Sequence, residues 1–366
     1  MDRGQATVLT GVRRCGKSTL QRQLMAQLAD GLYCNFEDTR LFGMSSEDFP
    51  NFLEALNAVS PATQPVFLDE VQEVEAWQRL VRAMLDQGRA VCLTGSNASL
   101  LGRELGAKLT GRHLSHEVFP FAYDEYLRFT QQEAGALSLR RFLDDGGFPI
   151  YLRTPRDQIL QELLRDVVLR DVVARYGLRE TRHVMNLLLF LLGNTGQAFS
   201  LQTLTKNLAI PTVAQTSRYL EYLQDAYLLF SAQKFSHSFK QRVVTPAKYY
   251  AIDNGLRRAA TPLPGAPNLG PRLENAVALA LRRRGRALHY ASERNLWECD
   301  FVTDSEAIQV CLELTPENRG RELRGVVAAV RQAGPRRALV LTLDQTDRLK
   351  EEDVEIEVLP AWRWLQ

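Results

Sequence analysis

The residues that most clearly indicate a chemical function form a short loop ten residues into the chain. Residues 11–18, with the sequence GVRRCGKS, fit the pattern G-x-x-x-x-G-K-[ST]. In such a loop the backbone N–H groups surround the phosphates of a nucleotide, the lysine contacts the β- and γ-phosphate oxygens, and the final hydroxyl binds Mg²⁺. The pattern therefore predicts a site for ATP and Mg²⁺ in which Ser18 is a metal ligand. The residues expected to contact the nucleotide are Gly11, Arg14, Cys15, Gly16, Lys17, Ser18 and Thr19.

A pair of acidic residues follows a second apolar segment. Residues 66–70, with the sequence VFLDE, are typical of a Walker B motif, an apolar strand that ends in carboxylates. Asp69 would hold Mg²⁺ through water, and Glu70 would orient and polarise the attacking water. A solvated acidic turn also explains a lone Asp-Glu pair, but the loop at residues 11–18 makes ATP hydrolysis the favoured interpretation.

Two further residues are expected to assist catalysis. The strand predicted at residues 90–94 leads to Asn97, our candidate for a polar residue between the Walker B carboxylates and the γ-phosphate, with Ser96 as the alternative. Arg112 is predicted to enter the ATP site of a neighbouring subunit, where it would stabilise charge that develops on the γ-phosphate. Arg103 competes for this role, and a solvated surface arginine is the alternative for both.

The elements that must position these residues alternate between strand and helix. Strands predicted at residues 6–10, 32–36 and 66–70 are separated by helical segments. This order is typical of an α/β fold with a parallel sheet, which binds nucleotide at the carboxyl ends of its strands. We therefore predict a P-loop ATPase core over residues 1–130, followed by a helical lid and linker over residues 131–182.

A winged helix is predicted over residues 183–261. Helices over residues 201–208 and 213–226, joined by a tight turn, form a helix-turn-helix, and two strands follow that flank a basic loop. Between residues 200 and 260, eight Lys and Arg side chains stand against three Asp and Glu. This local charge supports DNA as a partner, whereas winged helices also serve as protein-binding or interdomain modules. The residues expected to face a DNA groove are Gln215, Thr216 and Arg218.

The last part, residues 268–366, is predicted to be a small α/β domain. It resembles the PD-(D/E)XK nuclease core, in which a helix Glu, a strand Asp and a following E-x-K hold metal and activate water. Glu274 and Asp300 match the first two positions, but Gln309 and Cys311 stand where the Glu and Lys belong. Losing a carboxylate and the lysine removes metal charge balance and the group that assists the nucleophile. We therefore expect a nuclease-like domain that is catalytically inactive.

Composition limits the remaining classes. A chain of 366 residues is expected to form two or three domains, and a formal net charge of +2 means that any nucleic-acid surface must be local. Five cysteines without a C-x-x-C pair favour reduced thiols and a cytoplasmic location. No apolar run approaches the roughly 20 residues that span a bilayer, so no membrane contact is expected. Only about five residues precede the first strand, so either the base is covered from elsewhere or the N-terminus is shortened.

The motifs together resemble one family. In order they are GVRRCGKS, NFEDTR, VFLDEVQ, LTGSNASLL, LTGRHLSHEVFPF, GGFPIYL, KYYAIDNGL and ECDFV. They look like those of bacterial and archaeal AAA-type ATPases whose C-terminal half is a nuclease-like domain of unassigned function. The resemblance implies an AAA+ core, Mg-ATP and a homo-oligomer with arginine fingers, a hexamer among the options. Our leading hypothesis is an ATPase coupled to the binding and remodelling or translocation of DNA, branched DNA included. The alternative is a nucleotide-dependent switch whose C-terminal domains bind protein.

Overall fold

The computed structural model describes residues 3–28, 31–61, 63–95, 109, 111–236, 238, 245–260 and 268–366. The chain forms two compact units, which are Met1–Phe119 with Asp225–Tyr227, and Pro120–Gln224 with Leu228–Gln366. Among the described residues, no helix is both long and apolar enough to span a lipid bilayer.

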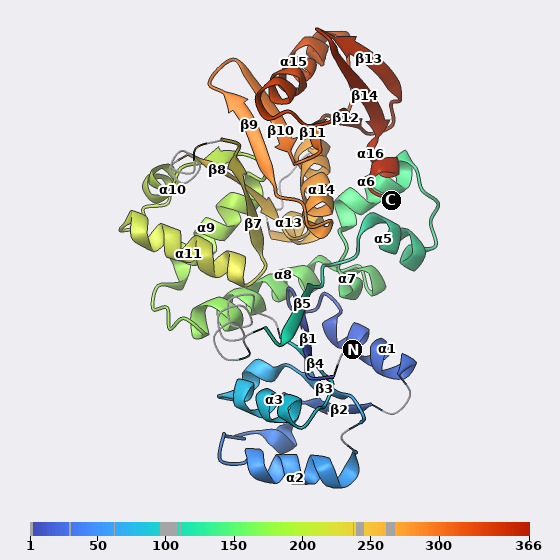
Figure 1. Ribbon diagram of the computed structural model, residues 1–366. Coiled ribbons are helices and arrows are strands. Elements are labelled where there is room, and N and C mark those ends of the chain that lie inside the picture. The colour runs from blue at the N-terminus through green and yellow to red at the C-terminus, as the bar shows by residue number, and fades with distance from the viewer. Residues whose placement is uncertain are drawn as a thin grey trace. The chain divides into compact units, whose positions relative to one another are not determined.

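The N-terminal unit contains a five-stranded parallel sheet in the order β2-β3-β4-β1-β5 (Figure 1). Its strands are β1 (Ala6–Thr10), β2 (Leu32–Asn35), β3 (Val66–Asp69), β4 (Val91–Thr94) and β5 (His113–Glu117). The described helices are α1 (Lys17–Gln27), α2 (Phe49–Val59) and α3 (Trp77–Asp86), with 3-10 turns at Thr39–Leu41 and Val71–Glu73. The predicted α/β fold with a parallel sheet is confirmed for this unit. Because β4 lies between β1 and β3, the ends of these three strands meet at one edge of the sheet.

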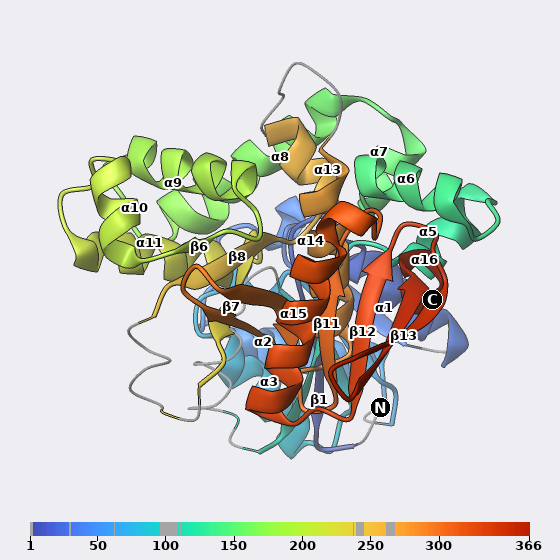
Figure 2. The same ribbon diagram turned by 90° about the horizontal axis from the view of Figure 1, so that it is seen from above.

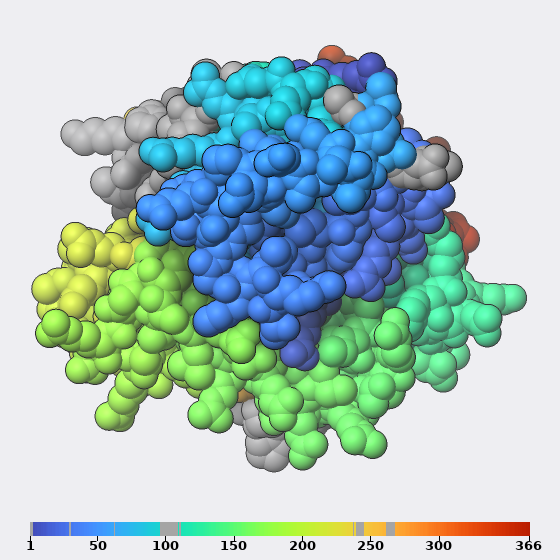
Figure 3. Space-filling model, turned by 90° about the horizontal axis from the view of Figure 1, so that it is seen from below, coloured from blue at the N-terminus to red at the C-terminus, as the bar shows by residue number. Residues whose placement is uncertain are grey.

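Burial explains why these strands form the centre of the sheet. Residues 66–68 of β3 are fully buried, and all of β4 is buried, as continuous apolar runs in a parallel sheet require. The helix α3 buries Trp77 and Leu80 in the same core. The helix α2 lies at the surface of this unit (Figure 3, blue) and buries Phe49 and Leu56 beneath it.

The C-terminal unit begins with a helical region. Its helices are α5 (Tyr123–Thr130), α6 (Ala136–Asp145), α7 (Pro149–Arg153) and α8 (Asp157–Asp166), and α8 continues into a π-helix at Val167–Ala174. The sequence predicts α5 as part of the ATPase core and α6 as part of the helical lid and linker. In the structure, Tyr126 of α5 and Leu143 of α6 share a hydrophobic core with Leu273 and Phe301. The compact N-terminal unit therefore ends at residue 119, before α5, because the apolar face of α5 is buried within the C-terminal unit.

A helical segment with a strand pair follows. It consists of α9 (Thr181–Gly193), β6 (Ala198–Phe199), α10 (Leu201–Asn207), α11 (Val213–Asp225), β7 (Leu229–Lys234), β8 (Ala247–Ala251) and α13 (Asn254–Ala260). The two helices of the predicted helix-turn-helix are present, and the N-cap Ser200 accepts a hydrogen bond from the Thr203 amide. The strands β7 and β8, which follow these helices, pair antiparallel.

The remaining elements are α14 (Leu269–Arg283), β9 (His289–Glu293), β10 (Trp297–Val302), β11 (Glu306–Val310), α15 (Pro316–Ala333), β12 (Arg337–Thr342), β13 (Asp347–Glu351), β14 (Val354–Pro360) and α16 (Ala361–Trp364). The sequence predicts residues 183–261 and 268–366 as separate modules. The structure joins their strands in one nine-stranded sheet, β13-β14-β12-β11-β10-β9-β7-β8-β6, because β7 pairs parallel with β9. The strand pair formed by β13 and β14 was not predicted, because β13 is polar and charged along most of its length.

Helices cover both faces of the C-terminal strands. In Figure 2, α15 runs along β9 to β12, and its Val326 packs with Ala307 and Val340. The neighbouring strand residues Ile308 and Leu339 face the opposite way and pack against α14, α5 and α6. This alternation is the two-residue period of a strand with two buried faces.

Candidate functional site

The loop at residues 11–18 has the backbone that a phosphate-binding loop needs. Gly11 has φ +142°, and a Cβ there would lie 2.1 Å from the Val118 carbonyl oxygen, so only glycine fits. Arg14 has φ 63°, and Gly16, with φ 115°, is the N-cap of α1. The helix α1 therefore starts at the loop and directs its free N–H groups and positive dipole end toward it, as anion binding requires.

Side chains of α1 fix this loop against the sheet. The Lys17 ammonium is buried and donates to the carbonyl oxygens of Gly11 (2.9 Å) and Val12 (3.0 Å). The Gln21 amide donates to the Leu68 and Cys92 carbonyls, both at 3.1 Å, which ties α1 to β3 and β4.

The other predicted nucleotide contacts differ in exposure. Cys15 is buried beside the Val118 carbonyl, and burial raises the pKa of its thiol, so this thiol is no nucleophile. Arg14 and Thr19 are exposed on the loop and the first turn of α1.

Three hydroxyl groups surround the Asp69 carboxylate at the end of β3. Ser18 donates to its Oδ1 at 3.1 Å, Thr94 donates to the same oxygen, and Tyr33 donates to Oδ2 at 2.6 Å. Burial, followed by the bond to Asp69, raises the pKa of Tyr33 to about 12, so its hydroxyl stays a donor at neutral pH. Ser18 and Asp69, the two predicted metal ligands, therefore lie together, and they are the hard oxygen donors that Mg²⁺ prefers.

Thr94 and Tyr33 were not predicted. Thr94 ends the strand after the Walker B strand, so its place as a polar residue at a strand end was the signal that could have found it. Tyr33 carried no signal in the sequence, because it contacts Asp69 only through the pairing of β2 with β3. Asn97, Ser96 and Arg103 lie outside the described residues.

Glu70 occupies a distinctive backbone position. Its φ of 53° turns the chain directly after β3, and its amide donates to the Thr94 hydroxyl at 3.0 Å. Burial raises the pKa of Glu70, while the Lys17 ammonium and a hydrogen bond from Gln72 act in the opposite direction. A half-buried carboxylate with a raised pKa beside the phosphate-binding loop suits a group that accepts a proton from water.

Arg112 is held within its own unit. Its guanidinium pairs with Asp86 at 2.5 Å and donates to the Gly4 carbonyl at 3.1 Å, and its side chain is 38% exposed. The arginine-finger role assigned to Arg112 stays a prediction.

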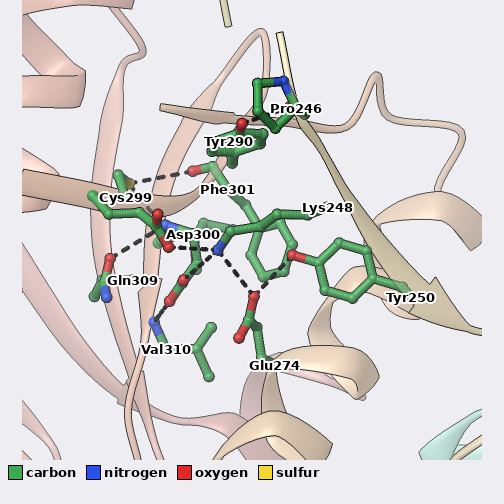
Figure 4. Close-up of polar contacts among 12 residues, drawn as sticks. Pro246, Lys248, Tyr250, Glu274, Tyr290, Cys299, Asp300, Phe301, Gln309 and Val310 are labelled. Carbon is green, nitrogen blue, oxygen red and sulfur yellow. Dashed lines mark hydrogen bonds and ion pairs between the residues drawn. The ribbon is translucent and has the colours of Figure 1, made fainter. Parts of the chain in front are cut away.

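The predicted nuclease-like positions form a second polar cluster (Figure 4). The Lys248 ammonium of β8 lies 3.3 Å from Glu274 Oε1 of α14 and 3.2 Å from Asp300 Oδ1 of β10. Tyr250 donates to Glu274 Oε1 at 2.8 Å, and the Val310 amide donates to Asp300 Oδ2 at 3.0 Å. The structure thus brings together the two carboxylates that the sequence singled out, and adds a lysine from a segment that we had assigned to another module.

The positions without the expected Glu and Lys have other partners. The Gln309 amide donates to Glu322 at 2.7 Å and its oxygen accepts from the Asp300 amide at 3.3 Å. Burial and the nearby Glu322 carboxylate raise the pKa of the Cys311 thiol to about 12. The Gln309 side chain therefore holds Asp300 by accepting a hydrogen bond from the Asp300 backbone amide. The Cys311 thiol stays protonated at neutral pH.

One predicted groove-facing residue of α11 is buried. The Thr216 hydroxyl lies 2.7 Å from that of Thr205 on α10, so it fixes the crossing of the two helices and cannot face a groove. Gln215 is half-buried, and Arg218 is exposed.

The N-terminal unit is a P-loop ATPase domain. Its defining features are the phosphate-binding loop, the buried strand β3 that ends in Asp69, and the strand β4 between β1 and β3. Residues 3–127 match the AAA domain family, and residues 137–266 match a domain of unknown function (DUF8612). An uncharacterized protein of Methanocaldococcus jannaschii is 32% identical over 391 residues, which cover 98% of this chain and 87% of that protein. An uncharacterized protein of Haemophilus influenzae is 32% identical over 337 residues, which cover 85% of this chain and 83% of that protein. The chain belongs to the same family as these two proteins, a family with an AAA-type ATPase domain.

Among solved structures, a Walker-type ATPase of Pyrococcus abyssi is similar over 70% of this chain and 90% of its own. The sequence identity is 17% and the TM-score is 0.44.

Proposed function

We propose that the chain binds Mg-ATP and hydrolyses it at the edge where β1, β3 and β4 end. The observation that carries the proposal is the Asp69 carboxylate, which joins Ser18 of the phosphate-binding loop to the polar end of β4. When bound there, Mg²⁺ supplies positive charge to the phosphate oxygens. Lys17 would bind the phosphates, Ser18 and Asp69 would hold the ion, and Glu70 would accept the proton of the attacking water.

Two variants separate binding from turnover. Lys17→Ala should abolish nucleotide binding, and Glu70→Gln should bind ATP with turnover lowered at least about 100-fold, because the amide cannot accept the proton. Glu73→Gln is the matched control, since this exposed acid lies three residues further on and should leave turnover unchanged. Fluorescent-nucleotide binding and phosphate release are the measurements. Normal turnover by Glu70→Gln would refute the catalytic assignment, and a wild-type protein that binds no ATP would refute the whole proposal.

We also propose that subunits share ATP sites through Arg112. The Arg112–Asp86 ion pair lies on the surface of the unit, so the guanidinium can exchange Asp86 for a partner's nucleotide at low cost. An equimolar mixture of Lys17→Ala and Arg112→Ala should then recover turnover that neither variant shows alone. Asp86→Asn, which frees the guanidinium, should keep turnover. Mixing that restores nothing, while Arg112→Ala alone stays active, would contradict a shared site.

A second candidate function is coupling of hydrolysis to DNA. Lys206 of α10 and Arg218 of α11 are both exposed on the helix pair, which favours contact with a phosphate backbone. Turnover should then rise with duplex, single-stranded or branched DNA. Arg218→Ala should weaken DNA binding most at low salt and make the affinity less dependent on salt. DNA-indifferent turnover together with no binding at low salt would exclude DNA, leave the ATPase intact and favour the protein-binding switch.

A further inference from the structure

The cluster around Lys248 has an unusual charge balance. The ammonium lies within ion-pair distance of three carboxylates, since Glu298 Oε1 is 2.8 Å away, in addition to the oxygens of Glu274 and Asp300 described above. The Lys248 side chain is only 2% exposed, whereas that of Glu298 is 49% exposed. One positive group thus lies beneath three carboxylates, one of which faces solvent.

The protonation of these groups follows from their surroundings. Burial by itself lowers the pKa of Lys248, but Tyr250 and the three carboxylates raise it well above its usual value, so it stays an ammonium. Burial and the Asp300 charge raise the pKa of Glu274 to about 7. One ammonium neutralises only part of the negative charge of the three carboxylates. Glu274 is held by α14, and Glu298 and Asp300 are held by β10.

The position of the ammonium is the one that a divalent ion would need. Carboxylate oxygens from two rigid elements converge on one point, at 2.8 to 3.3 Å from the nitrogen. A divalent ion such as Mg²⁺ needs oxygens at about 2.1 Å, so the carboxylates would have to close in by roughly 1 Å. Within the described part of the chain, no group of three His, Cys, Asp or Glu side chains is already arranged to hold a metal. With Lys248 in place, the carboxylates remain at ammonium distances.

We propose that Lys248 is the resident cation of this centre, that it occupies the position of a divalent ion, and that its removal leaves a divalent-cation site formed by Glu274, Glu298 and Asp300. In the native protein the centre then needs no metal. Its charge ties β8, which belongs to the helix-turn-helix segment, to α14 and β10. This role is independent of ATP hydrolysis in the N-terminal unit.

The test uses the full chain without nucleotide and with Asp69→Asn, which removes one of the two residues proposed to hold Mg²⁺ at the ATP site. In this background we add Lys248→Ala, alone and together with Asp300→Asn. Mn²⁺ binding is measured by electron paramagnetic resonance, and stability by thermal unfolding with Mn²⁺ or EDTA. Lys248→Ala should bind one Mn²⁺ and unfold about 5–10 °C higher when Mn²⁺ is roughly one hundred times its Kd. The added Asp300→Asn should remove most of this shift, and the protein with Lys248 intact should show none.

Several results would overturn the proposal. One is a folded Lys248→Ala protein whose stability and Mn²⁺ binding equal those of the version with Asp300→Asn. Another is a Mn²⁺ site in the protein with Lys248 intact that Asp300→Asn removes, because the ammonium would then not occupy the position. If Lys248→Ala does not fold in EDTA, its refolding yield decides, since Mn²⁺ should restore folded protein. Failure to refold with Mn²⁺, while the version with Asp300→Asn folds, would show that the three carboxylates form no cation site.

Discussion

Two glycines of α15 should respond to the same substitution with opposite signs. Gly320 lies on the exposed side of the helix, and a Cβ there would meet nothing within 4 Å. Gly325 lies against β10, where a Cβ would be 1.9 Å from the Glu298 carbonyl oxygen. Gly320→Ala is therefore a matched control for Gly325→Ala in helix propensity, and the two differ in the contact with β10.

The expected magnitudes follow from this contact. Alanine is more favourable than glycine in a helix interior by about 1 kcal/mol, so Gly320→Ala should raise the unfolding free energy by up to that amount. At Gly325 the carbonyl is backbone, so α15 must move away from β10 by roughly 1 Å, and such a gap forfeits about a quarter to a half of each dispersion contact. Leu323 and Val326 of α15 are buried beside β10. After the gain in propensity is subtracted, we expect Gly325→Ala to cost about 2 kcal/mol.

Urea denaturation of the full chain measures both changes. Trp297 of β10 packs against the core beneath α15, so its fluorescence reports the loss of this contact, and circular dichroism reports the helices. A Gly325→Ala protein as stable as the wild type, or stabilised like Gly320→Ala, would refute the close approach of α15 to β10.

Three further predictions concern single side chains. Tyr33→Phe removes one of the donors to Asp69, and the Mg²⁺ concentration for half-maximal turnover should rise about tenfold. Arg89→Met leaves the Ser60 carbonyl, 2.7 Å from the buried guanidinium, without this donor, and should lower the unfolding free energy by about 3 kcal/mol in urea denaturation. Because the pKa of Glu274 is raised from 4.5 to about 7, the folded state binds a proton more tightly than the unfolded state between these values. This contribution to stability is therefore present at low pH and is lost as pH rises toward 7. Glu274→Gln should remove this dependence, so urea denaturation across this pH range should show the difference from wild type changing by at most about 3 kcal/mol. A stability difference between Glu274→Gln and wild type that does not change with pH would contradict the raised pKa of Glu274. An unchanged Mg²⁺ requirement in Tyr33→Phe, or an unchanged unfolding free energy in Arg89→Met, would contradict the other two predictions.

The chemistry of the N-terminal unit was predictable because its signals are local. The spacing of residues 11–18 sets which backbone N–H groups and which side chains meet a phosphate, and Asp69 and Glu70 follow directly from the end of an apolar strand. The parallel sheet follows from the alternation of strands and helices. The Tyr33 hydroxyl was not predictable, because its contact with Asp69 depends on the register of β2 against β3.

The C-terminal unit shows the opposite case. Its helices and most of its strands follow from periodicity, but the sequence alone separated two modules that share one sheet. The resemblance to the PD-(D/E)XK nuclease core singled out Glu274 and Asp300, and it placed Cys311 where that core has a lysine. A lysine is present in space, from β8, 52 residues before Asp300.

Local patterns in the sequence are enough to locate the phosphate-binding loop, the two Walker B carboxylates and the pair Glu274 and Asp300. That Lys248 meets this pair follows from the tertiary fold, because β7 must pair with β9 before Lys248 can reach the carboxylates of α14 and β10. Short-range patterns report backbone geometry and burial within a few residues, whereas charge compensation in a buried site depends on contacts between segments that are distant in the chain.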